Sequence, residues 1–270
     1  MSGMMTLLTS CSDLKSDLPQ ASTGALTVHP DGWATPATAN FHGQAIRQVN
    51  WDLRECRTCH GNRYDGGTSN VSCLKCHTGA AGPEDCSTCH GSSNNPAPPR
   101  GLSSDTARTV RGVGAHQIHL TGGTISSRVA CNACHLVPTI LASSGHVDNS
   151  ISAEVRFDTA TFAGANQSYN SVAGTCASSY CHGNFPNGNS ANAVSWTDVS
   201  GNGAKCGTCH GDVAQSDPED RARPKTVSQG GTHPDKGAFG TTKCANCHGF
   251  VVDANLNFVD KAKHINGQIN

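Results

Sequence analysis

The feature that most constrains this chain is one short motif, Cys-x-x-Cys-His, which occurs six times. A seventh site keeps the final Cys-His pair but has four residues between its cysteines. The pattern is typical of sites where two thiols add to the vinyl groups of one porphyrin and the adjacent imidazole binds the iron. It therefore predicts seven covalently attached haem c groups. Numbered along the chain, the seven motifs are Cys56/Cys59/His60, Cys73/Cys76/His77, Cys86/Cys89/His90, Cys131/Cys134/His135, Cys176/Cys181/His182, Cys206/Cys209/His210 and Cys244/Cys247/His248.

Two other interpretations of the cysteine pairs are weaker. Repeated Cys-x-x-Cys pairs also occur in structural zinc sites, but zinc does not require a histidine directly after every second cysteine. A disulfide framework leaves the histidines unexplained in the same way. We therefore expect haem at all seven motifs, including the fifth, which has the long spacer.

The number of histidines matches the number of axial positions on seven irons. The chain has 14 histidines, and its methionines, Met1, Met4 and Met5, all lie at the extreme N-terminus. The count predicts that every iron is bound by two histidines, is low-spin and closed, and has a low reduction potential, because methionine ligation would raise that potential. The predicted second ligands are His29, His42, His116, His119, His146, His233 and His264.

Local sequence adds detail to some of these ligands. His116 and His119 are three residues apart, so on a helical turn they share a face and can serve two neighbouring haems. His29 and His233 each precede a proline, which favours an extended backbone. His29 and His264 lie on long polar terminal segments, so each can act within its own chain or in a neighbouring subunit. The sequence does not specify which haem takes which histidine.

The composition predicts a fold without a conventional core. Only 36% of the residues are hydrophobic and 5% aromatic, whereas the chain has 30 glycines and 12 prolines. We therefore expect a multihaem cytochrome c fold, mostly irregular, in which a chain of haems replaces the core, with short helices at the motifs and few short strands. Five motif histidines precede a glycine, which predicts left-handed caps. The alternation of apolar residues from Ile151 to Phe157 fits a strand or, equally well, an irregular loop.

The chain is expected to divide into five segments. A Pro/Ser/Asn-rich stretch from Ser92 to Asp105 separates the motif-rich parts. The predicted segments are a signal and lipobox remnant at 1–11, a polar tether at 12–28, a three-haem segment at 29–100, a single-haem segment at 101–160 and a three-haem segment at 161–270.

Haem c is attached outside the cytoplasm, so the motifs predict that the chain is exported. The first ten residues are a poor secretory signal, because they contain no Lys or Arg and only a short apolar stretch. Leu8-Thr9-Ser10-Cys11 nevertheless resembles a bacterial lipobox, and Cys11 is the one cysteine outside the motifs. We expect a lipid on Cys11 to be the only membrane anchor, with a start codon further upstream; a spare thiol is the alternative.

Residues 29–264 resemble the extracytoplasmic multihaem c-type cytochromes of metal-reducing bacteria, and the CxxxxCH motif at Cys176 followed by the CxxCH motif at Cys206 looks like a motif pair found there. The resemblance implies a stacked haem chain that passes electrons across or away from the outer membrane. It also implies an outer-membrane lipoprotein, a cell-surface protein or a subunit of an extracellular filament. The implied partners are other cytochromes, extracellular acceptors or further copies of the chain.

The leading functional hypothesis is an electron-transfer conduit that is not itself an enzyme. A multihaem reductase with one open axial position and a soluble periplasmic shuttle are the alternatives. Binding to nucleic acid is not expected, because 19 Lys and Arg residues are balanced by 20 Asp and Glu residues.

Overall fold

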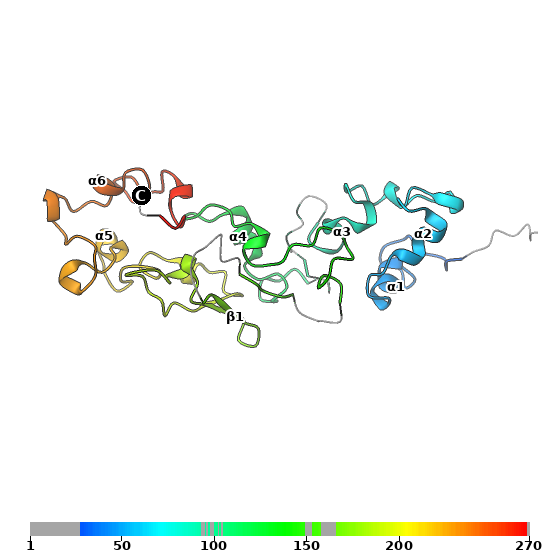
Figure 1. The fold of residues 1–270 in the computed structure, drawn as a ribbon, viewed down its shortest axis with the longest axis horizontal. Coiled ribbons are helices and arrows are strands. Elements are labelled where there is room, and N and C mark those ends of the chain that lie inside the picture. The colour runs from blue at the N-terminus through cyan, green and yellow to red at the C-terminus, as the bar shows by residue number, and fades with distance from the viewer. Residues whose placement is uncertain are drawn as a thin grey trace, which may run out of the picture. The chain divides into compact units, whose positions relative to one another are not determined.

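The structure is a computed structural model that describes residues 28–92, 95, 97, 100–101, 103, 105–148, 153–157 and 166–268. The chain divides into two compact units, Met1–Asp52 and Leu53–Asn270. Most of the described chain is irregular, and its longest helices have 7 residues (Figure 1). The predicted segment boundaries remain predictions.

The regular elements are short. The α-helices are α1 (His42–Gln48), α2 (Arg54–His60), α3 (Cys86–Cys89), α4 (His116–Thr121), α5 (Pro218–Ala222) and α6 (Ala245–His248). The 3₁₀ helices are η1 (Gly67–Ser69), η2 (Cys73–Lys75), η3 (Gly82–Glu84), η4 (Cys131–Ala133), η5 (Tyr180–His182), η6 (Asn202–Ala204), η7 (Val227–Gln229), η8 (Ala238–Gly240) and η9 (Lys261–Lys263).

Six of the seven motifs carry a turn of helix, as predicted. These turns are α2, η2, α3, η4, η5 and α6. The sixth motif, Cys206 to His210, forms turns instead. Gly207 lies between its two cysteines with φ +91°, and this left-handed backbone interrupts a right-handed helix.

One small sheet contains the first cysteine of the fifth motif. Its strands, β1 (Ser168–Asn170), β2 (Thr175–Ala177) and β3 (Val194–Ser195), are antiparallel in the order β1-β2-β3. Cys176 lies on the central strand, opposite Tyr169 and Val194. The alternating run at 151–157 is irregular over its described residues, 153–157. The loop interpretation therefore holds for that part of the run.

Gly183 forms the predicted left-handed cap at the end of η5, whereas Gly61 ends α2 with a positive φ but an extended ψ of 156°. Gly61, Gly91, Gly183 and Gly211 all have positive φ. Gly249 differs, with φ −62° in the right-handed region. It continues the turn after α6, so that two following amides bond to the carbonyl of His248.

Few apolar side chains are buried, as expected for this class of fold. Among the described residues the buried hydrophobic side chains are small or isolated, and none of the large side chains is fully enclosed. They are Leu53, Tyr64, Ala97, Val113, Ala115, Ala133 and Val251. No described helix has the length and apolar character needed to cross a bilayer.

Candidate haem-binding site

The second unit brings ten of the fourteen histidines together in five pairs. Each pair joins one motif histidine to one histidine from elsewhere in the chain. The ring centroids are separated by 6.1 to 6.4 Å. The pairs are His90–His146, His135–His116, His182–His119, His210–His264 and His248–His233.

This separation fits an iron held between two imidazoles. Two metal–nitrogen bonds of about 2.0 Å place the two ligating nitrogens about 4 Å apart. Each ring centroid lies about 1.1 Å beyond its ligating nitrogen, so the two centroids are expected about 6.3 Å apart. Direct ring stacking would bring the centroids closer, as in the 4.5 Å contact of His29 with Trp33. The five pairs therefore have the geometry of bis-histidine coordination.

Backbone carbonyls hold one nitrogen of most of these rings. Metal-binding histidines commonly donate their second ring N–H to a carbonyl, which fixes the tautomer and leaves the other nitrogen for the metal. In seven of the ten paired rings Nδ1 lies 2.6 to 2.9 Å from a backbone oxygen, which leaves Nε2 for iron. These rings are His116, His119, His135, His146, His210, His233 and His264.

Burial favours neutral imidazole, the form that binds iron, at five of the ten paired rings. Burial lowers the pKa of His90, and the nearby His146 and His135 lower it further. Burial also lowers the pKa of His210, against the opposing effect of the Ala222 carbonyl.

The motif cysteines lie at the surface of the polypeptide. None of the fourteen is buried. In each CxxCH motif one cysteine is exposed and the other half-buried, whereas both cysteines of the fifth motif are half-buried. The physical reason is that a thiol must point out of the polypeptide to reach a porphyrin vinyl group. The six exposed cysteines are Cys59, Cys76, Cys86, Cys131, Cys206 and Cys247.

The fifth motif uses its longer spacer to leave a strand and enter a helix. Cys176 lies on β2 and Cys181 lies on η5. Between them, Ser178 adopts a left-handed backbone with φ +54°, and its carbonyl accepts a hydrogen bond from the Asn184 side chain at 2.9 Å. The two additional residues thus form a turn that returns Cys181 and His182 toward the rest of the site.

Two asparagine side chains join the fifth and sixth motifs. Asn189 Nδ2 donates to the carbonyls of Gly207 and Thr208 at 2.9 and 3.0 Å, and Asn192 Nδ2 donates to the carbonyl of His182 at 3.0 Å. The loop between the motifs therefore acts as a structural part of both.

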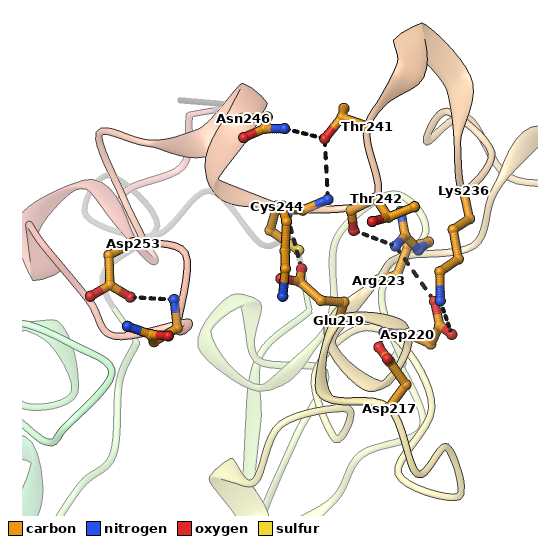
Figure 2. Close-up of polar contacts among 12 residues, drawn as sticks. Asp217, Glu219, Asp220, Arg223, Lys236, Thr241, Thr242, Cys244, Asn246 and Asp253 are labelled. Atoms are coloured by element: carbon orange, nitrogen blue, oxygen red, sulfur yellow. Dashed lines mark hydrogen bonds and ion pairs between the residues drawn. The ribbon is translucent and has the colours of Figure 1, made fainter.

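The seventh motif is anchored by a buried carboxylate on α5 (Figure 2). Glu219, only 6% exposed, accepts a hydrogen bond from the amide of Cys244 at 2.9 Å. Burial acts to raise the pKa of Glu219, but hydrogen bonds from Cys244 and Lys243 outweigh it and hold this pKa below its ordinary value. Burial and the carboxylate together raise the pKa of the Cys244 thiol to about 12. Arg223, which donates to the carbonyl of Thr242 at 3.4 Å, adds a second link between α5 and the segment before the motif.

The first three motifs are linked through a polar cluster around Tyr64. Arg57, which lies between the two cysteines of the first motif, forms an ion pair with Glu84, two residues before the third motif. The Tyr64 hydroxyl donates to Glu84 and accepts from Arg57. The carbonyl of Tyr64 accepts from the amide of Cys73, which opens the second motif, at 3.0 Å.

The remaining four histidines lie in the two separate units. In the first unit, His29 stacks on Trp33, and Nδ1 of His42 lies 2.8 Å from the Trp33 carbonyl. In the second unit, Nδ1 of His60 lies 2.8 Å from the carbonyl of Val71, and His77 belongs to the second motif. The roles predicted for these four residues remain predictions. Cys11 and the N-terminal methionines lie outside the described residues.

The fourteen described motif cysteines are free thiols. Across the described segments, no group of three or more His, Cys, Asp or Glu side chains is arranged to hold a metal ion. None of the fourteen described motif cysteines forms a disulfide.

Three residues at the site were not singled out from the sequence: Tyr64, Trp196 and Glu219. Each acts through contacts with residues far away in the chain, such as Tyr64 with Glu84 and Glu219 with Cys244. The only available signal for Trp196 was that the chain has just three tryptophans.

Comparison with known proteins supports the chemistry of this site. Residues 175–210, which hold the fifth and sixth motifs, match the family described as the Geobacter CxxxxCH...CXXCH motif. This match supports assigning the chain to the multihaem c-type cytochromes, which bind haem c covalently, transfer electrons and lie outside the cytoplasm. No match was found among curated proteins or among solved structures.

Proposed function

We propose that the protein is a heptahaem, bis-histidine electron conduit. The observation that carries this proposal is the five ring pairs, in which every motif histidine with a described partner faces a histidine from outside the motifs. The four other histidines divide in the same proportion, two within motifs and two outside them. Bound haem c would be the one-electron carrier at each site. The protein provides the attachment of each haem, its axial ligands and its distance from the neighbouring haem.

Contacts between successive motifs support a continuous path from the third haem to the seventh. His135 lies close enough to His90 to lower its pKa, which burial lowers most. One helix, α4, carries the partners of His135 and His182. Cys209 Sγ lies 3.7 Å from the carbonyl of Cys181.

The last step of this path joins the sixth motif to the seventh. The pKa of His210, which burial lowers most, is also lowered by His233 and His248, the pair of the seventh motif. In the proposed conduit, haems three to seven therefore follow one another in space as their motifs do in the sequence. Haems one to three form a cluster around Tyr64, since Cys56 also acts on the pKa of Cys73, which burial raises.

We further propose electron transfer without catalysis of its own. The paired rings leave no iron position open at five of the sites, whereas a reductase needs one. We propose attachment to the outer membrane through Cys11, or assembly into a filament, with cytochromes or extracellular acceptors as partners. This part of the proposal is supported by the lipobox-like sequence before Cys11.

Substitution of each non-motif partner tests the proposal. Replacing His146, His116, His119, His264 or His233 with Ala should convert one haem per chain from low-spin to high-spin, as seen by electron paramagnetic resonance of the ferric holoprotein. Gln117→Ala is the matched control, because Gln117 lies on α4 between two proposed ligands and should leave every haem low-spin. A fully low-spin spectrum in the histidine variants would show that these rings are not ligands.

A further inference from the structure

One tryptophan contacts the proposed axial ligands of two different haems. The indole of Trp196 meets the ring of His116 edge-on, with centroids 4.7 Å apart and planes at 89°. It lies nearly parallel to the ring of His119, with centroids 5.6 Å apart and planes at 24°. Because His116 faces His135 and His119 faces His182, the indole lies beside a ligand of the fourth haem and a ligand of the fifth.

The indole is itself held firmly. The amide of Trp196 donates to the carbonyl of Gly174 at 2.8 Å, and its Nε1 donates to the carbonyl of Arg111 at 2.7 Å. The guanidinium of Arg111 in turn bonds to two carbonyls of the turn between β1 and β2. Gly114 leaves space for the ring, since a Cβ at this position would lie 2.1 Å from Nε1.

Each of the two histidine rings is oriented by one hydrogen bond besides its contact with the indole. Nδ1 of His116 bonds to the carbonyl of Val113, and Nδ1 of His119 bonds to the carbonyl of Ala115, each at 2.9 Å. This hydrogen bond fixes the tautomer and the general orientation of each ring. The indole adds a second contact against the ring, and because aromatic pairs prefer edge-on or parallel geometry, it restricts the remaining rotation of the imidazole plane.

We propose that Trp196 is a positioning residue that fixes the imidazole planes of His116 and His119, and thereby the electronic state of the fourth and fifth haems. The proposal rests on the proposed function, since it requires an iron between the rings of each pair.

Electron paramagnetic resonance of ferric holoprotein tests the proposal, because the spectrum of a low-spin haem depends on the angle between its two imidazole planes. In Trp196→Ala, the low-spin signals of two haems should shift from their wild-type positions while the haem content stays the same. Trp196→Phe keeps a flat ring and should give signals close to wild type. Trp51→Ala is the control, because Trp51 makes no aromatic contact within the described part of the chain, and it should leave the spectrum unchanged.

Two outcomes separate this proposal from the proposed function. An unchanged spectrum in Trp196→Ala overturns the positioning role and leaves the ligand assignments intact. A wild-type spectrum without low-spin bis-histidine signals overturns the proposed function instead. If the alanine variant loses haem, Trp196→Leu keeps an apolar side chain without a flat ring, and unshifted signals in that variant overturn the positioning role equally.

Discussion

The imidazole rings of His119 and His182 face each other at 6.3 Å with their planes inclined by 68°. The pair His210–His264 is inclined by 78°. The other three pairs lie closer to parallel, at 24°, 25° and 35°. The protein therefore presents two classes of ring pair at one nearly constant separation.

We expect these two classes in the electron paramagnetic resonance spectrum of the ferric protein. Pairs near parallel give rhombic low-spin signals, whereas pairs near perpendicular give a strongly anisotropic signal, because the two ligands then act equally on the two iron orbitals that they overlap. At least two haems should give the second kind of signal. A spectrum in which every haem gives the rhombic signal would contradict the ring orientations of His119 and His264.

Haem count is the next prediction. Intact mass of the holoprotein should show seven haem increments, because Cys176, Cys181 and His182 retain every bonding group despite the long spacer. Replacing both Cys176 and Cys181 with Ser should remove one increment. Cys11→Ser should remove none, since Cys11 lies outside the motifs. Six increments in the wild type would show that the long-spacer site carries no haem.

His264→Ala should leave a high-spin haem in the isolated chain, without any need for assembly. The ring of His264 lies 6.3 Å from that of His210 in the same chain, and its Nδ1 bonds to the carbonyl of Ile125 at 2.6 Å. Lys261→Ala is a suitable control, because it removes a neighbouring link to Gly123 and keeps the ligand. If Lys261→Ala gave the same high-spin signal, the loss would reflect displacement of the C-terminal segment.

Gly183→Ala should destabilise the contact between the fifth and sixth motifs. A β-carbon at φ +112° would lie 2.7 Å from the carbonyl oxygen of Asn189 and 2.8 Å from that of Cys209. Left-handed backbone alone costs a non-glycine residue about 1–2 kcal/mol, and the contacts with two carbonyls add to this cost. Thermal unfolding followed by circular dichroism measures the effect.

Gly201→Ala is the matched control for this substitution. Gly201 lies in the same loop with φ +86°, and a β-carbon there would meet nothing within 4 Å. It should therefore show only the backbone cost and a smaller fall in the unfolding temperature. Equal losses in the two variants would mean that the close contacts at Gly183 relax freely.

From the sequence, the haem-attachment motifs are easier to predict than the pairing of histidines that lie far apart in the chain. A thioether motif is local, so Cys-x-x-Cys-His specifies both attachment points and one ligand within five residues. The second ligand depends on long-range folding: His90 faces His146 and His210 faces His264, each more than fifty residues further along the chain. Only the shared helix face of His116 and His119 was predictable, because their spacing alone determines it.

Regular structure away from the motifs was harder to predict. The strands β1 to β3 have two or three residues each, too few to produce a recognisable alternation. Their pairing depends on the turn at Asn170 to Gly174, where the Asn170 side chain accepts from two backbone amides. At the sixth motif, Gly207 was the available signal that a helical turn would not form.

Each non-motif histidine lies either before or after its partner motif in the sequence. This position predicts the order in which the proposed haems gain their second ligand. In a chain exported from its N-terminus, the fourth, fifth and seventh motifs emerge after their partners His116, His119 and His233. The third and sixth motifs emerge before theirs, and wait for His146, 56 residues after His90, and for His264, 54 residues after His210. In the proposed conduit those two haems would stay five-coordinate longest and would be open to stray ligands during maturation, and a chain truncated before His264 would leave the sixth haem open.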